Sequence, residues 1–262
     1  MSDDRTLPAG TGISEDDFIK AAEQNKGFTK DESVIPFTKI MQPLSPEVGM
    51  VPGAAPGVFL NVATNRVIDG KEGMIVIPVV NRWNFTEWSA SKGEGGQFVK
   101  DWGEDETGWQ QLCEPDQKFA YQPITKDGHS ILKARHFFIF QIDEVGDVEV
   151  SVLSLSATSL KIAKAWSSMM QYAPKISTRN GMMTPAYFYY TYKITTEENK
   201  NQKGRWFQPK IAYNTVDNKL ITVLDLPNGK AIWNQALGFR DSLMAGDVRT
   251  ASQAEDMDDP TI

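Results

Sequence analysis

The stretch Ile131–Ile142 reads ILKARHFFIFQI, and it decides the fold class of this chain. Aliphatic and aromatic residues of the kind that favour strands dominate it. Because successive side chains of a strand point to opposite faces of a sheet, one face is apolar apart from His136. The other face carries Lys133, Arg135 and Phe137. The segment therefore predicts a strand with one buried face and one face that combines cations with a ring.

Further strands are predicted on both sides of this segment. Met74–Trp88 is rich in β-branched and aromatic residues, and its Pro78 suggests an edge or a bulge. Val148–Ala157 reads as another strand, and Ala186–Thr196 with Gly204–Asn214 predicts a hairpin around a polar turn at 197–203. Weaker strand signals occur at 34–41 and 220–224.

Three segments have a helical period, with apolar residues at i, i+3 and i+4: Ser14–Lys26, Thr158–Ala173 and Asn228–Met244. No repeat or linker divides the middle of the chain. We therefore expect an α+β fold, mainly antiparallel, with a small barrel, one inserted helix and helical ends. The expected organisation is an N-terminal arm and short helix over 1–32, one β-rich domain over 33–245, and a flexible acidic tail over 246–262.

Composition narrows the class of protein. Of 262 residues, 40% are hydrophobic and 23% are charged, which is an ordinary globular mixture. The apolar runs are too short to span a bilayer, and the first residues lack the pattern of a secretory signal. The single cysteine, Cys113, excludes an internal disulfide and fits a reducing compartment. These features predict a cytoplasmic protein that does not contact membranes.

Charge is unevenly distributed along the chain. The net charge is −7, yet residues 118–230 contain fifteen Lys or Arg against nine Asp or Glu. Residues 251–262 contain four acidic side chains and no basic one. Overall acidity is therefore no argument against a polyanionic partner for the central segment.

Motifs for catalysis or metal binding are missing from the sequence. Cys113, His129 and His136 are too widely spaced for a zinc site, and the glycines at 93–96 lack the spacing of a phosphate-binding loop. Neither GxSxG nor HExxH occurs. We expect no catalytic residues, no metal and no cofactor, although an enzyme with an unfamiliar arrangement of residues stays open as an alternative.

The predicted strands carry rings and cations on shared faces. In the hairpin, Tyr187, Tyr189 and Lys193 alternate onto one side, and Trp206 and Lys210 onto one side of the partner strand. Exposed bases stack on rings while Lys and Arg neutralise phosphates. The predicted nucleic-acid-binding residues are Lys133, Arg135, Phe137, Tyr187, Tyr189, Lys193, Trp206 and Lys210. A weaker group is Arg82, Trp83, Phe85 and Trp88. The alternative is that these rings are core residues.

The C-terminal segment is the second functional signal. Its acidic residues and final apolar residue form a predicted partner-binding set: Glu255, Asp256, Asp258, Asp259 and Ile262. Such a segment can compete with nucleic acid for a basic surface or contact a partner protein. The alternative is a solvated, disordered end with neither role.

Several stretches resemble phage-encoded single-stranded DNA-binding proteins. They are the tail Glu-Asp-Met-Asp-Asp-Pro-Thr-Ile, the segment Tyr187–Phe207 with its Lys-Ile-Thr-Thr and Trp-Phe, Ser154–Trp166, and, more loosely, Pro56–Val62. The resemblance implies an OB-like barrel and the coating of single-stranded DNA in replication or recombination. It also implies tail-mediated contacts with phage or host replication, recombination or transcription enzymes. The chain is longer than a minimal OB-fold, and its tail ends in Ile rather than an aromatic residue.

The sequence thus predicts a non-enzymatic protein that binds single-stranded DNA without sequence preference. One alternative is a structural or virion-associated β-protein whose aromatic strands pack against other subunits. Another is a recombination mediator that anneals strands, or a transcription accessory factor. Oligomeric state, and DNA against RNA preference, are open at this point.

Overall fold

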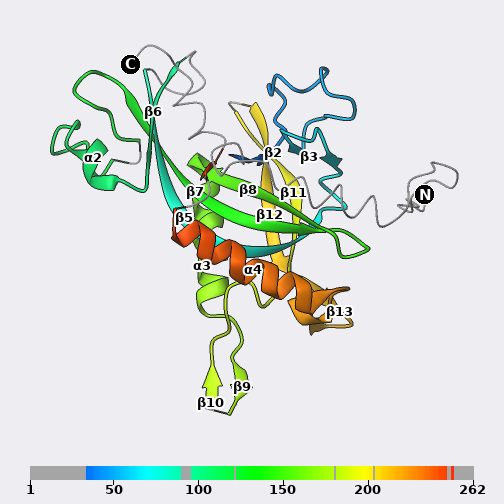
Figure 1. Cartoon of the computed structure of the whole chain (residues 1–262). Coiled ribbons are helices and arrows are strands. Elements are labelled where there is room, and N and C mark those ends of the chain that lie inside the picture. The colour runs from blue at the N-terminus through cyan, green and yellow to red at the C-terminus, as the bar shows by residue number, and fades with distance from the viewer. Residues whose placement is uncertain are drawn as a thin grey trace, which may run out of the picture.

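The computed structural model describes residues 34–89, 96–120, 122–179, 181–202, 204–246 and 249–250. Its main sheet has the strand order β12-β11-β5-β7-β8-β2-β3-β4, and β6 pairs with β5 (Figure 1). All of these strand pairs are antiparallel except β2–β8, which is parallel. The strands are β2 (Phe37–Ile40), β3 (Phe59–Asn61), β4 (Val67–Ile68), β5 (Met74–Trp88), β6 (Phe98–Gly103), β7 (Ser130–Ile142), β8 (Val148–Ser156), β11 (Tyr192–Asn201) and β12 (Gly204–Tyr213).

The remaining elements are short pairs and helices. Two-stranded pairs join β1 (Val34–Ile35) to β15 (Arg249–Thr250), β9 (Ile176–Thr178) to β10 (Gly181–Met183), and β13 (Thr215–Val216) to β14 (Lys219–Leu220). The helices are α2 (Glu106–Gln110), α3 (Leu160–Gln171) and α4 (Gly229–Met244), with short 3-10 turns η2 (Ala157–Ser159) and η3 (Val223–Asp225). No helix in the described part of the chain is long and apolar enough to cross a membrane.

The longest pairing joins β5 to β7. It runs from Ile75 opposite Ile142 to Trp88 opposite Ser130, with a shift in register between Pro78 and Val80. The shift confirms the predicted bulge, because proline has no N–H to give to a ladder. At this point β7 is the partner strand that the pairing shows for β5, because the ladder between β5 and β11 covers only residues 74–76.

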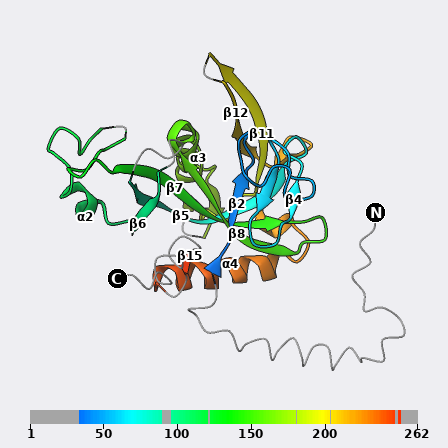
Figure 2. The same cartoon turned by 90° about the horizontal axis from the view of Figure 1, so that it is seen from above.

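Two helices cover opposite faces of this sheet (Figure 2). On one face, Trp166 of α3 stacks on Phe137 of β7 with ring centroids 4.3 Å apart. On the other face, Phe239 of α4 packs against Phe140 of β7 at 5.4 Å. Both β7 rings are completely buried. Each face of β7 therefore contributes to its own apolar core, which the alternation of the sequence predicts for only one face.

The sheet curls into a half-barrel, and hydrogen bonds join the β11–β12 hairpin to the loops beside β2, β3 and β4. The side-chain amide of Gln42, just after β2, donates to the Phe207 carbonyl at 3.0 Å and accepts from the Phe207 N–H at 2.9 Å. Thr196 of β11 donates through its N–H to Gly70 O at 2.7 Å and through its hydroxyl to Gly57 O at 2.6 Å. These bonds attach the β11–β12 hairpin to the loops that flank β3 and β4.

A lobe formed by β6, α2 and the chain up to β7 extends from the end of β5. Its centre is a small core of Phe85, Trp109, Cys113 and Ile131. The buried Glu87 carboxylate accepts from Trp102 Nε1 at 3.0 Å and lies 2.7 Å from His129 Nδ1. The buried Glu87 carboxylate of β5 thus contacts both β6 and the segment just before β7.

Most of the predicted elements are confirmed. The strands Met74–Trp88 and Ile131–Ile142, the strand that follows, and the helices after 158 and 228 are present, and the α+β class holds. The hairpin differs, because β11 begins only at Tyr192 and continues to Asn201, past the start of the predicted turn. The 220–224 strand is reduced to part of β14, followed by η3. The 14–26 helix lies outside the described residues. Of the predicted tail over 246–262, the structure describes residue 246 and β15, which pairs with β1, and the acidic residues lie outside the described part.

The contacts between the β11–β12 hairpin and the loop at Gly70 lead to a test of stability. A Cβ at Gly70 would lie 1.9 Å from Gly57 O and 2.1 Å from Thr196 Oγ1. Overpacking of this kind costs about 1–3 kcal/mol, and backbone atoms cannot rotate away, so we expect Gly70→Ala to lower the free energy of unfolding by about 3 kcal/mol.

The matched control is Gly238→Ala in α4, where an added Cβ meets no atom within 4 Å. Alanine replaces glycine in a helix with a gain of about 0.5–1 kcal/mol. Urea unfolding of both variants checks the contrast. Equal stability of Gly70→Ala and the natural chain would show that the hairpin is not closed against these loops.

Candidate nucleic-acid interface

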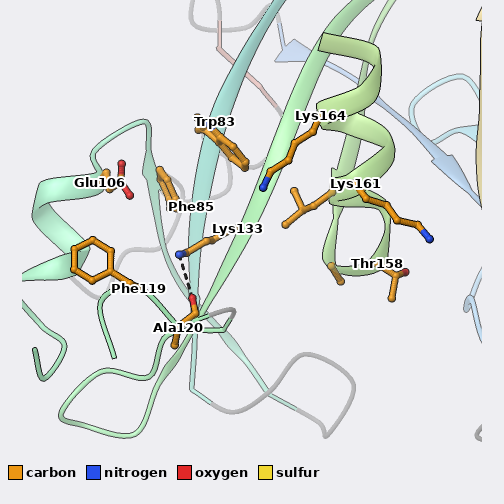
Figure 3. A pocket seen from close by; sticks show the side chains of 11 residues that line it. Trp83, Phe85, Glu106, Phe119, Ala120, Lys133, Thr158, Lys161 and Lys164 are labelled. Atoms are coloured by element: carbon orange, nitrogen blue, oxygen red, sulfur yellow. Dashed lines mark hydrogen bonds between the residues drawn. The ribbon is translucent and has the colours of Figure 1, made fainter. Parts of the chain in front are cut away.

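A groove opens where β5 and β7 run beyond α3. Phe137 lies beneath the helix, whereas Arg135 and Lys133 follow on the same face of β7 toward the lobe. The groove has a volume of about 690 Å³. Strands form its floor, α3 forms one wall and the lobe forms the other (Figure 3).

Three aromatic rings line this groove. Trp83 and Phe85 stack along β5 with centroids 6.3 Å apart and an interplanar angle of 19°. Phe85 is buried against Trp109, which leaves half-buried Trp83 as the reachable ring of the pair. Phe119 lies across the groove and is 85% exposed. A floor ring and a wall ring thus face the same open volume.

Three lysines line the same volume, and Arg135 lies beside it over the Trp83 ring. Arg135 lies with its guanidinium 5.1 Å from the Trp83 ring centroid, and its Nε donates to Asn81 Oδ1 at 2.8 Å. Lys133 donates to the Ala120 carbonyl at 3.3 Å, the bond drawn in Figure 3. Lys161 and Lys164 are exposed on α3, and Figure 3 shows Lys164 directed toward the strands.

These cations have no carboxylate partners in the described part of the chain. None of the ion pairs found there involves Lys133, Arg135, Lys161 or Lys164. Glu106 is the acidic side chain among the groove residues. Burial lowers the pKa of Lys133 overall, and Glu106 opposes this shift without forming an ion pair with the lysine. The groove is therefore a site where positive charge is in excess.

Burial makes this excess charge costly. Desolvation lowers the pKa of Lys133, and the neighbouring Lys164 lowers it further by like-charge repulsion. Desolvation also lowers the pKa of Arg135. A lowered pKa in a basic group means that its charged form is less stable than in water. An anion bound between these side chains would remove that penalty.

The structure brings only some of the predicted residues together. Lys133 lines the groove, and Arg135 lies beside it with its guanidinium over the Trp83 ring. Phe137 shares their face, as the alternation predicts, but α3 covers it completely, so its ring belongs to the core. This corrects its assignment to the open face.

The two tyrosines are also placed differently from the prediction. Both precede β11, so strand alternation does not put them beside Lys193. Tyr189 packs on Tyr190 with centroids 4.9 Å apart and contributes to the core, while Tyr187 is 43% exposed. The reason is that the chain turns at 187–189 before it enters the sheet.

The hairpin residues form a separate group. Lys193 lies opposite Ala212, and Lys210 opposite Thr195, which places the two lysines and Trp206 on one face of the hairpin. Both lysines are exposed, but neither lines the groove. Their part in binding remains a prediction. Trp206 is half-buried in a second groove.

Sequence reasoning missed the walls of the groove. Lys161 and Lys164 lie three residues apart on the polar side of the helix, a spacing that places both on one surface. Trp83 and Phe85 share a face in the weaker predicted group, and their register opposite Arg135 and Lys133 is the signal that unites them. No sequence signal marks Phe119.

The histidines do not add to the charge of the site. Burial, reinforced by Arg82, lowers the pKa of His136 to about 3, so this side chain is neutral near pH 7. The ring of His129 contacts Glu87 in the lobe. Within the residues that the structure describes, no three His, Cys, Asp or Glu side chains cluster in a way that suits a metal ion.

The fold and groove define a curled, half-barrel α+β protein with an aromatic, cationic groove on one face. The family model of the Pam3 phage gp34-like protein matches residues 10–249. The chain belongs to this family. Comparison with curated proteins and with solved structures gave no match.

The difference in burial between Phe137 in the core and Trp83 in the groove is testable. Phe137→Ala should lower the free energy of unfolding by about 3–5 kcal/mol, because it removes a fully buried ring under α3. Trp83→Ala should cost clearly less, because Trp83 is only half-buried at the groove floor. Urea unfolding of both variants measures the difference. A larger loss for Trp83→Ala would mean that its ring belongs to the core and not to an open site.

Proposed function

We propose that this protein binds single-stranded DNA without sequence preference and has no enzymatic activity. The observation that carries the proposal is the groove in which Trp83 and Phe119 share a volume with three lysines, beside Arg135. None of these four cations has a carboxylate partner among the described residues. Stacking platforms beside a positively charged path are the combination that holds a single strand.

The chemistry of the groove favours a single strand over a duplex. In a duplex the base faces are stacked on one another, so Trp83 and Phe119 would find only edges and backbone. A single strand can place a base against each ring, and each such contact contributes about 1–3 kcal/mol. Its phosphates then meet the lysines on the wall and floor, and counterions are released.

The strand order supports an OB-like reading of the half-barrel. The meander β5-β7-β8 leads into α3, and the β11–β12 hairpin then returns to pair with the first strand of the meander. OB-folds are small barrels of this kind whose strand faces bind oligonucleotides. The parallel strand β2 and the lobe are additions to such a barrel.

Membership of a phage family gives the proposal its biological setting. We propose that the protein coats and protects single-stranded DNA in the host cytoplasm during phage replication or recombination. The acidic segment 251–262 would compete for the groove and contact phage or host enzymes of replication, recombination or transcription.

The salt dependence of binding tests the groove. Each phosphate neutralised on a single strand contributes about −0.7 to the slope of log affinity against log salt, so four cations give a slope of about −3. Affinity for oligo(dT) should then fall about 50-fold between about 50 and 200 mM salt. Lys133→Ala with Lys161→Ala and Lys164→Ala should bring the slope to about −0.7.

The control is the pair Lys219→Ala and Lys230→Ala, which removes exposed lysines on β14 and α4 outside the groove. These changes should leave the slope as it is. Fluorescence anisotropy with a labelled oligonucleotide measures all the chains. Undetectable binding, or an equal loss of slope in control and groove variants, would remove the groove as the binding site.

Deletion of residues 251–262 tests the competition by the tail. The four carboxylates are tethered to the same chain, so they act at a high effective concentration. The deletion should tighten oligonucleotide binding, most clearly at low salt where screening is weak. Titrations at two salt concentrations compare the two chains. Weaker binding after deletion would show that the segment supports the interface.

A further inference from the structure

We propose that the bound strand continues from the first groove, across the turn at 157–159, into the second groove, where Trp206 is its stacking platform. This inference rests on the proposed function. It assigns a second subsite for the strand to the second groove, where the cations are already paired with carboxylates. The ligand of that subsite is a further stretch of the same single strand.

The two grooves are continuous at one point. The second groove has a volume of about 960 Å³, and Ala157 and Thr158 line both grooves. In the second groove the floor is the opposite face of β7, represented by Leu132, Ala134 and His136. A strand that leaves the first groove over the turn therefore arrives directly in the second.

The turn itself has two unusual features. Ala157 is exposed and has a φ of 47°, a left-handed conformation that is unfavourable for a residue other than glycine. Thr158 accepts a hydrogen bond at 2.9 Å from Gln208 Nε2 of β12. Gln208 and Trp206 lie two residues apart on one strand face. The bond thus holds Trp206 near the crossing point.

Rings dominate the second groove. Trp88 and Phe98 pack edge to face with centroids 5.8 Å apart, and Trp206 and Phe207 approach from β12. Trp88, Phe98 and Trp206 are all half-buried, unlike the completely buried rings under α3 and α4. Among the described residues, the buried indole N–H of Trp206 has no hydrogen-bond partner. A base stacked at this site would use the exposed part of the Trp206 ring.

The charges differ between the two grooves. Lys39 pairs with Glu47 at 3.3 Å and Arg205 with Glu198 at 3.6 Å, so each of these cations has a carboxylate beside it. A phosphate entering the second groove would release few counterions. The second subsite should therefore add affinity through stacking while the salt slope stays at the value set by the first groove.

Oligonucleotide length separates the two subsites. The full chain is titrated with oligo(dT) of about 4 and about 16 nucleotides, the limits of typical single-strand sites. Trp206→Ala should weaken binding of the long oligomer by about 5- to 150-fold and leave the short one unchanged. Trp83→Ala should weaken both. Trp206→Phe, which keeps a ring, should restore most of the long-oligomer affinity.

The outcomes distinguish failure of the inference from failure of the proposed function. If neither oligomer binds the natural chain, the proposed function is wrong. If the long oligomer binds but Trp206→Ala has no selective effect, or if its extra affinity has a steeper salt slope, the second subsite is wrong. Should Trp206→Ala fail to fold, Phe98→Ala gives the same comparison from the other side of the groove, and an unchanged long-oligomer affinity in Phe98→Ala overturns the proposal.

Discussion

The pairing of β5 with β7 is the interaction on which the rest of the structure depends. Both strands run past the helices that cover them, so one continuous ladder contributes to the apolar core, the groove and the lobe. Under α3 the shared face carries Phe137, and two and four residues toward the lobe it carries Arg135 and Lys133. The apolar core holds the β5–β7 ladder in place. The register of this ladder then decides which side chains face the groove.

The partly buried cations at the groove cost folding free energy, and packing alone does not explain their presence there. Lys133 and Arg135 lose part of their hydration, and α3 adds Lys164 to the same side. A carboxylate stabilises a cation elsewhere in the described chain, as Glu149 does for Arg66 at 2.6 Å. An unpaired cationic cluster beside accessible rings is destabilising for the free protein and favourable for a complex with an anion that carries flat bases.

Sequence reasoning reached the sheet more readily than the site. Alternation identified β7 and its mixed face, and Pro78 predicted the bulge in β5. Alternation placed Tyr187 and Tyr189 in a strand, because a turn rich in aromatic residues resembles a strand in composition. Alternation also cannot show how far a helix extends over a face, which decides that Phe137 is core and Arg135 is not. The lobe depends on tertiary contacts of Glu87 with Trp102 and His129, and these contacts have no local sequence pattern.

The central claim is that a single strand lies in the groove between α3 and the lobe. Photo-crosslinking of the full chain to a 5-bromodeoxyuridine oligonucleotide, with the modified peptides identified by mass spectrometry, tests it most directly. The account predicts that crosslinks concentrate on Trp83 and Phe119, which face the groove from β5 and from the lobe. Crosslinks confined to surfaces outside both grooves, such as the β9–β10 hairpin with its exposed Met182, would contradict it.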